Sequence, residues 1–284
     1  MRRAPLIMSK DKCWWSMEVG WDVSWALSAV SHQPTPNACR AIRDSLAGCL
    51  RNWCVPVYHS PMSLEAIFFD VGGTIVLANY DRTLKPLMAR GVRPTGAELA
   101  AAEKAAKSRL DSQILQQGKI SVDNGYWDNY YTALLQTLGL DDAELKSDLI
   151  ARTRTSANWN RLADGAEATL RELGRKYRLG IISNSDGRID ELLRQLGILD
   201  LFACVTDSGI VGHEKPDSRI FISATQSMGV STQEAAYVGD IYSVDYLGAM
   251  SVGMRAILMD AAGVYSDRPG ERIDRIQELL KILR

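Results

Sequence analysis

From residue 164 to the C-terminus, short apolar runs alternate with stretches of helical period, and this alternation limits the possible folds most strongly. Predicted strands cover 178–184 ("RLGIISN"), 202–207 ("FACVTD"), 235–240 ("AAYVGD") and 255–260 ("RAILMD"). Predicted helices alternate with these strands at 164–177, 188–197, 217–229 and 243–253, and a last one covers 271–283. An earlier apolar run, "LEAIFFD", ends at Asp70 and is typical of a buried strand. Strands that alternate with helices predict an α/β fold with a doubly wound parallel sheet, a Rossmann-type core.

A helical block interrupts this pattern between the first and second predicted strands. Residues 80–160 contain apolar positions at helical spacing and no convincing strand. One helix ends near Gly118, a second ends at Gly139, and a third begins in the acidic stretch "DDAEL". We therefore predict a core formed by 62–79 and 161–284, with an inserted α-helical cap domain at 80–160.

Residues 1–61 differ in composition from the rest of the chain. They hold four of the five cysteines and five of the seven tryptophans. A zinc site is disfavoured because no close C-x2-C pair occurs, and a disulfide framework because no secretory signal precedes it. We interpret the segment as an extension without a function of its own. Our hypothesis is that Met62 is the true start, and mass spectrometry of the native N-terminus would test it.

Charge and hydropathy argue against two classes of partner. The net charge is −1 and no basic stripe occurs, so nucleic acid is not an expected partner. No run of 18 apolar residues is present, so we expect no membrane-spanning segment. Together with the lack of a secretory signal, this predicts a cytoplasmic protein.

Polar residues gather where the predicted strands end. Parallel sheets bind ligands beyond the carboxyl ends of their strands. Asp70 follows the first strand, Ser183 and Asn184 follow the second, and Asp240 follows "YVG", with Asp245 about one helical turn further on. Each of these alone is commonly a turn or cap residue. Their combination at one sheet edge indicates a site, which Lys215 in "HEKPD" joins at a predicted helix start.

Four motifs in this order resemble those of the haloacid dehalogenase (HAD) superfamily of phosphatases and related hydrolases. They are "DVGGT", "SN", "KP" and "GDIYSVD", and the resemblance covers about Leu64 to Leu258. The helical block is similar to the family's cap of the first type. The resemblance implies a phosphoric monoester hydrolase, a Mg²⁺-dependent HAD-type phosphatase acting on a small phosphorylated metabolite.

The resemblance also implies residue roles. Asp70 would be the nucleophile that forms an aspartyl-phosphate. Ser183 and Asn184 would bind the substrate, and Lys215 would bind it too while neutralising charge on Asp70 and the phosphoryl group.

The implied metal site contains Asp70, the backbone carbonyl of Gly72, and Asp240, with Asp245 in or next to the first coordination shell. Clustered carboxylates raise one another's pKa unless a cation binds. Mg²⁺ suits such an oxygen-only set.

Gly72 departs from the family pattern. Phosphatases of this family usually carry a second aspartate there, which protonates the leaving oxygen and activates water. Such help is worth about 10²–10⁴ in rate, or roughly 3–5.5 kcal/mol of barrier. Three options stay open: a substrate whose leaving group needs no donated proton, a replacement from the cap or from water, or a weakly active protein that chiefly binds or regulates.

Two other branches of the family also differ at this position. The dehalogenase branch needs no metal, whereas "GDIYSVD" keeps the Gly-Asp metal pair, which disfavours dehalogenation. The phosphonate-cleaving branch has a small residue here but needs a Schiff-base lysine from its cap. Nothing in the sequence distinguishes one lysine among the candidates Lys85, Lys104, Lys107, Lys119 and Lys146.

Some further residues have weaker claims to a role. Trp127 and Tyr131 share helical spacing with two leucines, which predicts packing, although they and Tyr130 could face substrate. Arg82, beside Tyr80 at the hinge into the cap, could pair with a phosphate or carboxylate. His213 is a conceivable proton donor and more simply a loop histidine.

Overall fold

The computed structural model describes residues 63–117 and 122–283. These residues fall in a unit that begins at Pro61. The predictions made for residues 1–61, including the start at Met62 and the cysteine-rich extension, lie outside the described residues. Lys119 also lies outside them.

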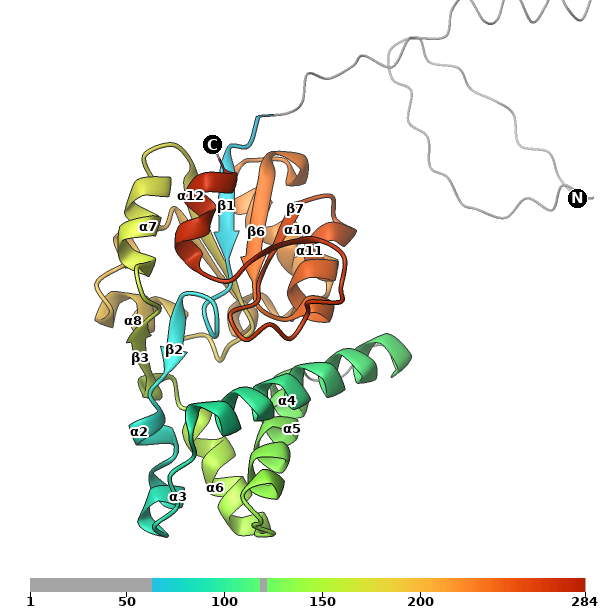
Figure 1. Cartoon of the computed structure of the whole chain (residues 1–284). Helices are drawn as coiled ribbons and strands as arrows, with labels where there is room; N and C mark the ends of the chain where they lie inside the picture. The colour runs from blue at the N-terminus through green and yellow to red at the C-terminus, as the bar shows by residue number, and fades with distance from the viewer. Residues whose placement is uncertain (1–62, 118–121, 284) are drawn as a thin grey trace, which may run out of the picture. The chain divides into compact units, whose positions relative to one another are not determined.

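The main sheet is parallel and is covered by helices on both faces (Figure 1). In the described part of the chain it has six strands in the order β5-β4-β1-β6-β7-β8, and all neighbours are parallel. The strands are β1 (Ala66–Phe69), β4 (Arg178–Ser183), β5 (Cys204–Asp207), β6 (Ala235–Gly239), β7 (Arg255–Met259) and β8 (Glu271–Ile273). This arrangement confirms the predicted doubly wound α/β fold.

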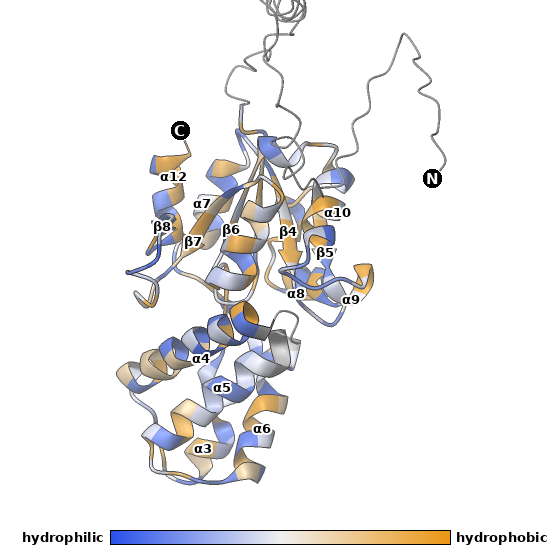
Figure 2. Cartoon of the chain, turned by 90° about the vertical axis from the view of Figure 1, so that its right-hand side faces the viewer, coloured by the Kyte–Doolittle hydropathy of each residue, from blue (hydrophilic) through white to orange (hydrophobic). Residues whose placement is uncertain are grey.

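Alternate residues of each strand point to opposite faces of the sheet. In β1, Ile67 and Phe69 pack into one hydrophobic core, and Ala66 and Phe68 pack into the other. Because both faces are buried, the strands read as continuous apolar runs. In Figure 2, β4 and β7 are coloured mainly as hydrophobic.

Helices on each face supply the matching apolar side chains. The first core takes side chains from α7 (Ala166–Leu173), α8 (Ile189–Gln195) and α12 (Leu279–Ile282). The second takes them from α10 (Ser218–Met228), α11 (Leu247–Ser251) and the π-helical turn η6 (Tyr242–Tyr246). The remaining short helices of the core are α9 (Ser208–Val211), η4 (Leu199–Leu201), η5 (Thr232–Glu234) and η7 (Ile276–Glu278).

Among the described residues, five α-helices lie between β2 and β3, and we call residues 80–153 the helical insertion. They are α2 (Tyr80–Thr83), α3 (Lys85–Ala89), α4 (Gly96–Gln117), α5 (Val122–Thr137) and α6 (Ala143–Thr153), followed by η3 (Ser156–Asn158). The insertion has a hydrophobic core of its own, to which α4 contributes Ala102 and Ala106. The predicted packing role of the α5 aromatics is confirmed, since Tyr131 is buried there and Trp127 packs against the same cluster.

A small antiparallel sheet connects the insertion to the core. β2 (Val76–Ala78) pairs with β3 (Trp159–Leu162). The prediction of no convincing strand within residues 80–160 is therefore wrong at the end of that range, where β3 begins at Trp159. Strands of three and four residues are too short to show a period, and their pairing joins distant parts of the chain.

The C-terminal segment also differs from the prediction. Residues 271–283 were expected to form one helix, but they contain β8, η7 and the short helix α12. β8 extends the sheet edge beside β7. The apolar spacing of Ile273, Ile276 and Leu283 imitates a helix, although Ile273 is buried from β8, Ile276 from η7, and Leu283 from the position directly after α12.

Among the described helices, none combines the length and apolarity that crossing a bilayer requires.

Candidate active site

Three aspartates meet at the carboxyl edge of the sheet. Asp70 follows β1, where its backbone N–H donates to the Val238 carbonyl at 2.8 Å. Asp240 follows β6, and Asp245 lies in η6. All three are buried, and one carboxylate oxygen of each lies within 4.8 Å of the others. β1 and β6 are neighbours where the order of connection reverses, which is the usual ligand site in such sheets.

Lys215 ties two of these carboxylates together. Its ammonium donates to Asp70 Oδ1 at 2.6 Å, to Asp245 Oδ1 at 2.8 Å and to the Tyr237 hydroxyl at 2.8 Å. Its side chain is only 3% exposed. The predicted helix start at Lys215 is wrong, because α10 begins at Ser218 with Asp217 as its N-cap. Lys215 therefore lies in the loop that precedes the helix.

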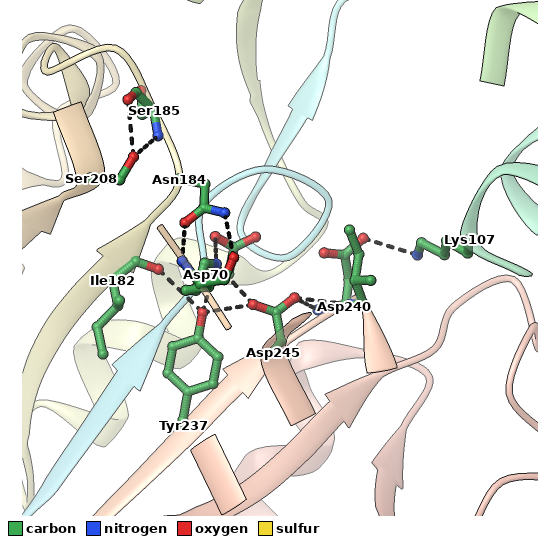
Figure 3. A network of polar contacts seen from close by, with 11 residues as sticks. Asp70, Lys107, Ile182, Asn184, Ser185, Ser208, Tyr237, Asp240 and Asp245 are labelled. Atoms are coloured by element: carbon green, nitrogen blue, oxygen red, sulfur yellow. Dashed lines mark hydrogen bonds and ion pairs between the residues drawn. The ribbon is translucent and has the colours of Figure 1, made fainter. Parts of the chain in front are cut away.

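Asn184 positions this loop. Its side-chain oxygen accepts from the Lys215 backbone N–H at 2.7 Å, and its amide nitrogen donates to the Lys215 carbonyl at 3.1 Å. Figure 3 shows Asn184 among the residues of this polar network. Through these bonds Asn184 fixes the backbone of Lys215. Ser183, buried at the end of β4, lies on the strand next to β1.

Asp245 is largely saturated by protein donors. Its Oδ2 accepts from the backbone N–H groups of Asp240 at 3.1 Å and Ile241 at 2.9 Å. Its Oδ1 accepts from Lys215 and from the Tyr237 hydroxyl at 2.9 Å. A carboxylate offers about four lone-pair sites, so these contacts favour a positioning role for Asp245 next to the first metal shell.

Tyr237 is a site residue that the sequence analysis missed. It lies within β6 and is 1% exposed. Its hydroxyl accepts from Lys215 and is within 3.2 Å of the Ile182 carbonyl. Within a buried strand that otherwise consists of aliphatic residues and glycine, a tyrosine three residues before Asp240 was the available signal. Such a residue usually needs a partner for its hydroxyl.

Burial and clustered charge shift the pKa values of the site. Burial raises the pKa of Asp70 to about 7, with Lys215 opposing the shift and the two other aspartates adding to it. Burial likewise raises the pKa of Asp240. For Lys215, burial would lower the pKa, but Asp245 and Asp70 outweigh it and hold the pKa above its usual value. The site thus combines two carboxyl groups whose pKa values are raised with an ammonium whose pKa is raised.

The donor set fits Mg²⁺. The cluster offers only oxygen ligands, and they are buried close together. Asp70 and Asp240 have raised pKa values that a bound cation would lower again. Hard divalent cations prefer carboxylate and carbonyl oxygens. Asp70 and Asp240 are the residues that would hold it.

Lys107 is a second site residue that was not singled out. It comes from α4, is 3% exposed, and places its ammonium 2.9 Å from Asp240 Oδ2 and 2.7 Å from Glu103 Oε1. Figure 3 shows it reaching Asp240 from the helical insertion. Burial lowers its pKa, but Asp240 and Glu103 outweigh burial and hold the pKa well above the usual value. In sequence, the Glu103–Lys107 spacing resembles an ordinary exposed i,i+4 pair.

Gly72 and Gly73 occupy positions that favour glycine for different structural reasons. Gly73 has φ +75°, and a Cβ there would lie 2.5 Å from Asp240 Oδ2. Gly72 has no positive φ, but a Cβ there would lie 3.2 Å from the Trp159 ring. The Trp159 indole N–H donates to the Thr153 carbonyl at 2.7 Å, which fixes the ring. The side chain of Trp159 thus covers the position where an acid would stand.

The structure shows where Arg82 and His213 lie, two residues whose predicted roles are weaker. Arg82 donates to the Ala157 carbonyl at 3.1 Å, which links the two connections into the helical insertion. His213 is half-buried, two residues before Lys215.

Comparisons with known proteins identify the family. Residues 64–253 match the family described as haloacid dehalogenase-like hydrolase, so the chain belongs to the haloacid dehalogenase superfamily of hydrolases. It is 33% identical over 138 residues to the mouse haloacid dehalogenase-like hydrolase domain-containing protein 3, covering 47% of this chain and 55% of the relative. The chain therefore spans about half the length of that relative.

Two other proteins match over their full or nearly full length. A glyceraldehyde 3-phosphate phosphatase of Methanothermobacter thermautotrophicus is 30% identical over 236 residues, covering 78% of this chain and 100% of the relative. The magnesium-bound structure of the putative HAD-hydrolase YfnB from Bacillus subtilis superposes with a TM-score of 0.58 at 20% identity. It covers 78% of this chain and 99% of that one. At this identity the superposition shows the fold alone.

Proposed function

We propose that this protein is a Mg²⁺-dependent phosphatase that hydrolyses a small phosphorylated metabolite through an aspartyl-phosphate on Asp70. The observation that carries the proposal is the Asp70–Lys215 contact of 2.6 Å inside the buried three-carboxylate cluster. A nucleophile held against an ammonium next to a cation site matches what phosphoryl transfer requires, namely positioning and charge stabilisation. We also propose that residues 80–160, which include the helical insertion, form the cap, with residues 62–79 and 161–284 as the core.

The residues of this chain have distinct tasks in this mechanism. Asp70 uses a carboxylate oxygen to attack phosphorus, while Lys215 offsets charge on Asp70 and on the phosphoryl oxygens. The Ser183 hydroxyl binds a phosphoryl oxygen. Asp245 and Tyr237 hold Lys215 in place by the contacts described above. Asp70, Asp240 and the Gly72 carbonyl would hold Mg²⁺, which would supply charge neutralisation.

The relatives support a small substrate. The archaeal relative, matched over its full length, is named as a phosphatase of a three-carbon phosphate ester. We extend to this chain only the class, a small soluble phosphate ester.

Lys107 bears on the phosphonate alternative. It is a cap lysine at the site, as a Schiff-base mechanism would need. However, two carboxylates lie within 2.9 Å of its ammonium, and they stabilise the charged form, which is not nucleophilic. The structure therefore gives the phosphonate reading no support beyond the position of the lysine.

A panel of phosphate esters tests the proposal. Protein beginning at Met62, together with the full-length chain, is assayed against phosphorylated metabolites and aryl phosphates with Mg²⁺ and with a chelator. We expect hydrolysis that depends on Mg²⁺. Mg²⁺ and phosphate binding without turnover of any ester would favour the alternative, a binding or regulatory protein.

A further inference from the structure

Lys107 is the charged group that the helical insertion brings to the edge of the site. Its ammonium contacts Asp240 Oδ2 at 2.9 Å and Glu103 Oε1 at 2.7 Å, and the side chain is buried. Lys104, three residues earlier on the same helix, is exposed. Lys107 therefore differs from its helical neighbour by its burial and by its contact with the core.

The ammonium contacts a carboxylate oxygen that lies against Gly73. The oxygen that Lys107 contacts, Asp240 Oδ2, is also the atom that a Cβ on Gly73 would approach to 2.5 Å. Lys107 and Gly73 thus approach the same carboxylate oxygen, and Gly72 directly precedes Gly73 in the chain. This is the part of the site where the family's usual proton donor is replaced by Gly72.

Neighbouring contacts fix the helix that carries Lys107. One turn further along α4, Asp111 Oδ1 accepts from the Ser243 backbone N–H at 3.1 Å. Between them Leu110 packs against Val244. Polar and apolar contacts therefore hold this face of α4 on the segment that carries Asp240 and Asp245.

We propose that Lys107 stabilises the departing oxygen of the substrate as an anion, in place of the proton that Gly72 cannot donate. This inference rests on the proposed phosphatase function. An Asp70 oxygen forms its bond to phosphorus as the ester P–O bond breaks. The electron pair of that bond stays on the departing oxygen, whose charge faces the Lys107 ammonium and which takes its proton from water after release.

The substrate class follows from this role. Without a proton donor at Gly72, the enzyme selects esters whose leaving oxygen is a weak base, such as enol, acyl or aryl phosphates. Lys107 extends that range toward more basic oxygens, because a fixed positive charge lowers the energy of the anion as it forms.

The test is a series of aryl phosphates with leaving groups of increasing pKa. Wild-type protein is compared with Lys107→Met, Lys107→Gln and the matched control Lys104→Met. We expect Lys107→Met to lose about 10²–10³-fold in kcat/KM on the most basic leaving group and little on the least basic one. Its plot of log kcat/KM against leaving-group pKa is then steeper than that of the wild type, and Lys104→Met follows the wild type.

Calorimetric titration with Mg²⁺ and with inorganic phosphate supplies a readout independent of turnover. We expect Lys107→Met to bind both. Lys107→Gln can keep a hydrogen bond to Asp240 without the charge, so it gives the same test if Lys107→Met is misfolded by circular dichroism.

Three results would overturn the inference. The first is an unchanged slope in folded Lys107 variants, and the second is an equal loss on every ester. The third is loss of Mg²⁺ binding in both variants, which would make Lys107 a structural support of the metal site. In each case wild-type turnover leaves the phosphatase proposal standing. A wild type that hydrolyses no ester removes the phosphatase proposal, and this inference with it.

Discussion

Asp70 is the residue on which the proposed chemistry depends most directly. Its carboxylate is buried and accepts from Lys215. In Asp70→Asn the amide has nearly the same shape but is a far poorer nucleophile. We expect kcat to fall by about 10⁴ or more, with an unchanged circular dichroism spectrum. Turnover near the wild-type rate would show that another group attacks phosphorus.

The raised pKa of Asp70 makes metal binding dependent on pH. Because the pKa is about 7 rather than 3.8, Asp70 is protonated below neutrality and Mg²⁺ must displace that proton. We expect Mg²⁺ affinity to weaken as pH falls from about 7 to about 5, by up to tenfold per pH unit. Calorimetry across this range measures it, with Asp70→Asn as the control that should show a smaller dependence. A flat profile in the wild type contradicts the assignment of Asp70 as a ligand.

The sequence patterns predict the site residues that follow strands, but they do not predict those that reach the site from α4 or β3. Asp70, Asp240 and Asp245 were brought together as expected from the carboxyl-edge rule. Lys107 and Trp159 were not assigned to the site, because their positions depend on how α4 and β3 pack, which no local pattern records.

The two glycines in the turn after β1 should differ in how much a substitution by alanine costs. Gly73→Ala places a Cβ at positive φ and 2.5 Å from Asp240 Oδ2. We expect it to lower the free energy of unfolding by about 1–2 kcal/mol and to weaken Mg²⁺ binding. Gly72→Ala, whose φ is ordinary, should cost less in both. Denaturant unfolding and Mg²⁺ titration compare them, and equal effects would contradict the distinction.

The pairing of β2 with β3 decides what Gly72→Asp can achieve. The new carboxylate could donate the missing proton, so hydrolysis of alkyl phosphates should rise relative to aryl phosphates, by at most about 10²–10⁴. However, its Cβ would meet the Trp159 ring at 3.2 Å. We therefore expect a larger gain in the double variant with Trp159→Leu than in Gly72→Asp alone.

The measurement is the ratio of alkyl to aryl rates at saturating Mg²⁺. Trp159→Leu alone is the control and should leave the ratio near that of the wild type. A ratio that does not move in either Gly72→Asp variant, in protein that still binds Mg²⁺, would mean that proton donation does not limit this protein.

Element prediction succeeded where strands are buried on both faces and failed where they are short. β1, β4, β6 and β7 have uninterrupted apolar runs that mark them clearly. β8 has three residues and lies at the sheet edge, and only one of its side chains, Ile273, is buried. Because Ile273 also fits the apolar spacing of a helix, the sequence predicts a helix there and not a strand.

In the whole molecule, the helical insertion adds side chains to a site that the α/β core otherwise forms. The α/β core supplies Asp70, Lys215 and the two later aspartates. The helical insertion adds Lys107 through α4, and the strand that closes it adds Trp159 over Gly72. The first set lies in the motifs that resemble those of the family, whereas the second set comes from the insertion and from the strand that follows it.

The central claim is that Asp70 carries the phosphoryl group during turnover. The most direct measurement is acid quenching of the enzyme during hydrolysis of an aryl phosphate with Mg²⁺, followed by mass spectrometry of its peptides. The account predicts one added phosphoryl group on the peptide that contains Asp70, and none in Asp70→Asn. Steady turnover with a phosphoryl group on a different residue, reproducibly trapped under the same conditions, would contradict it.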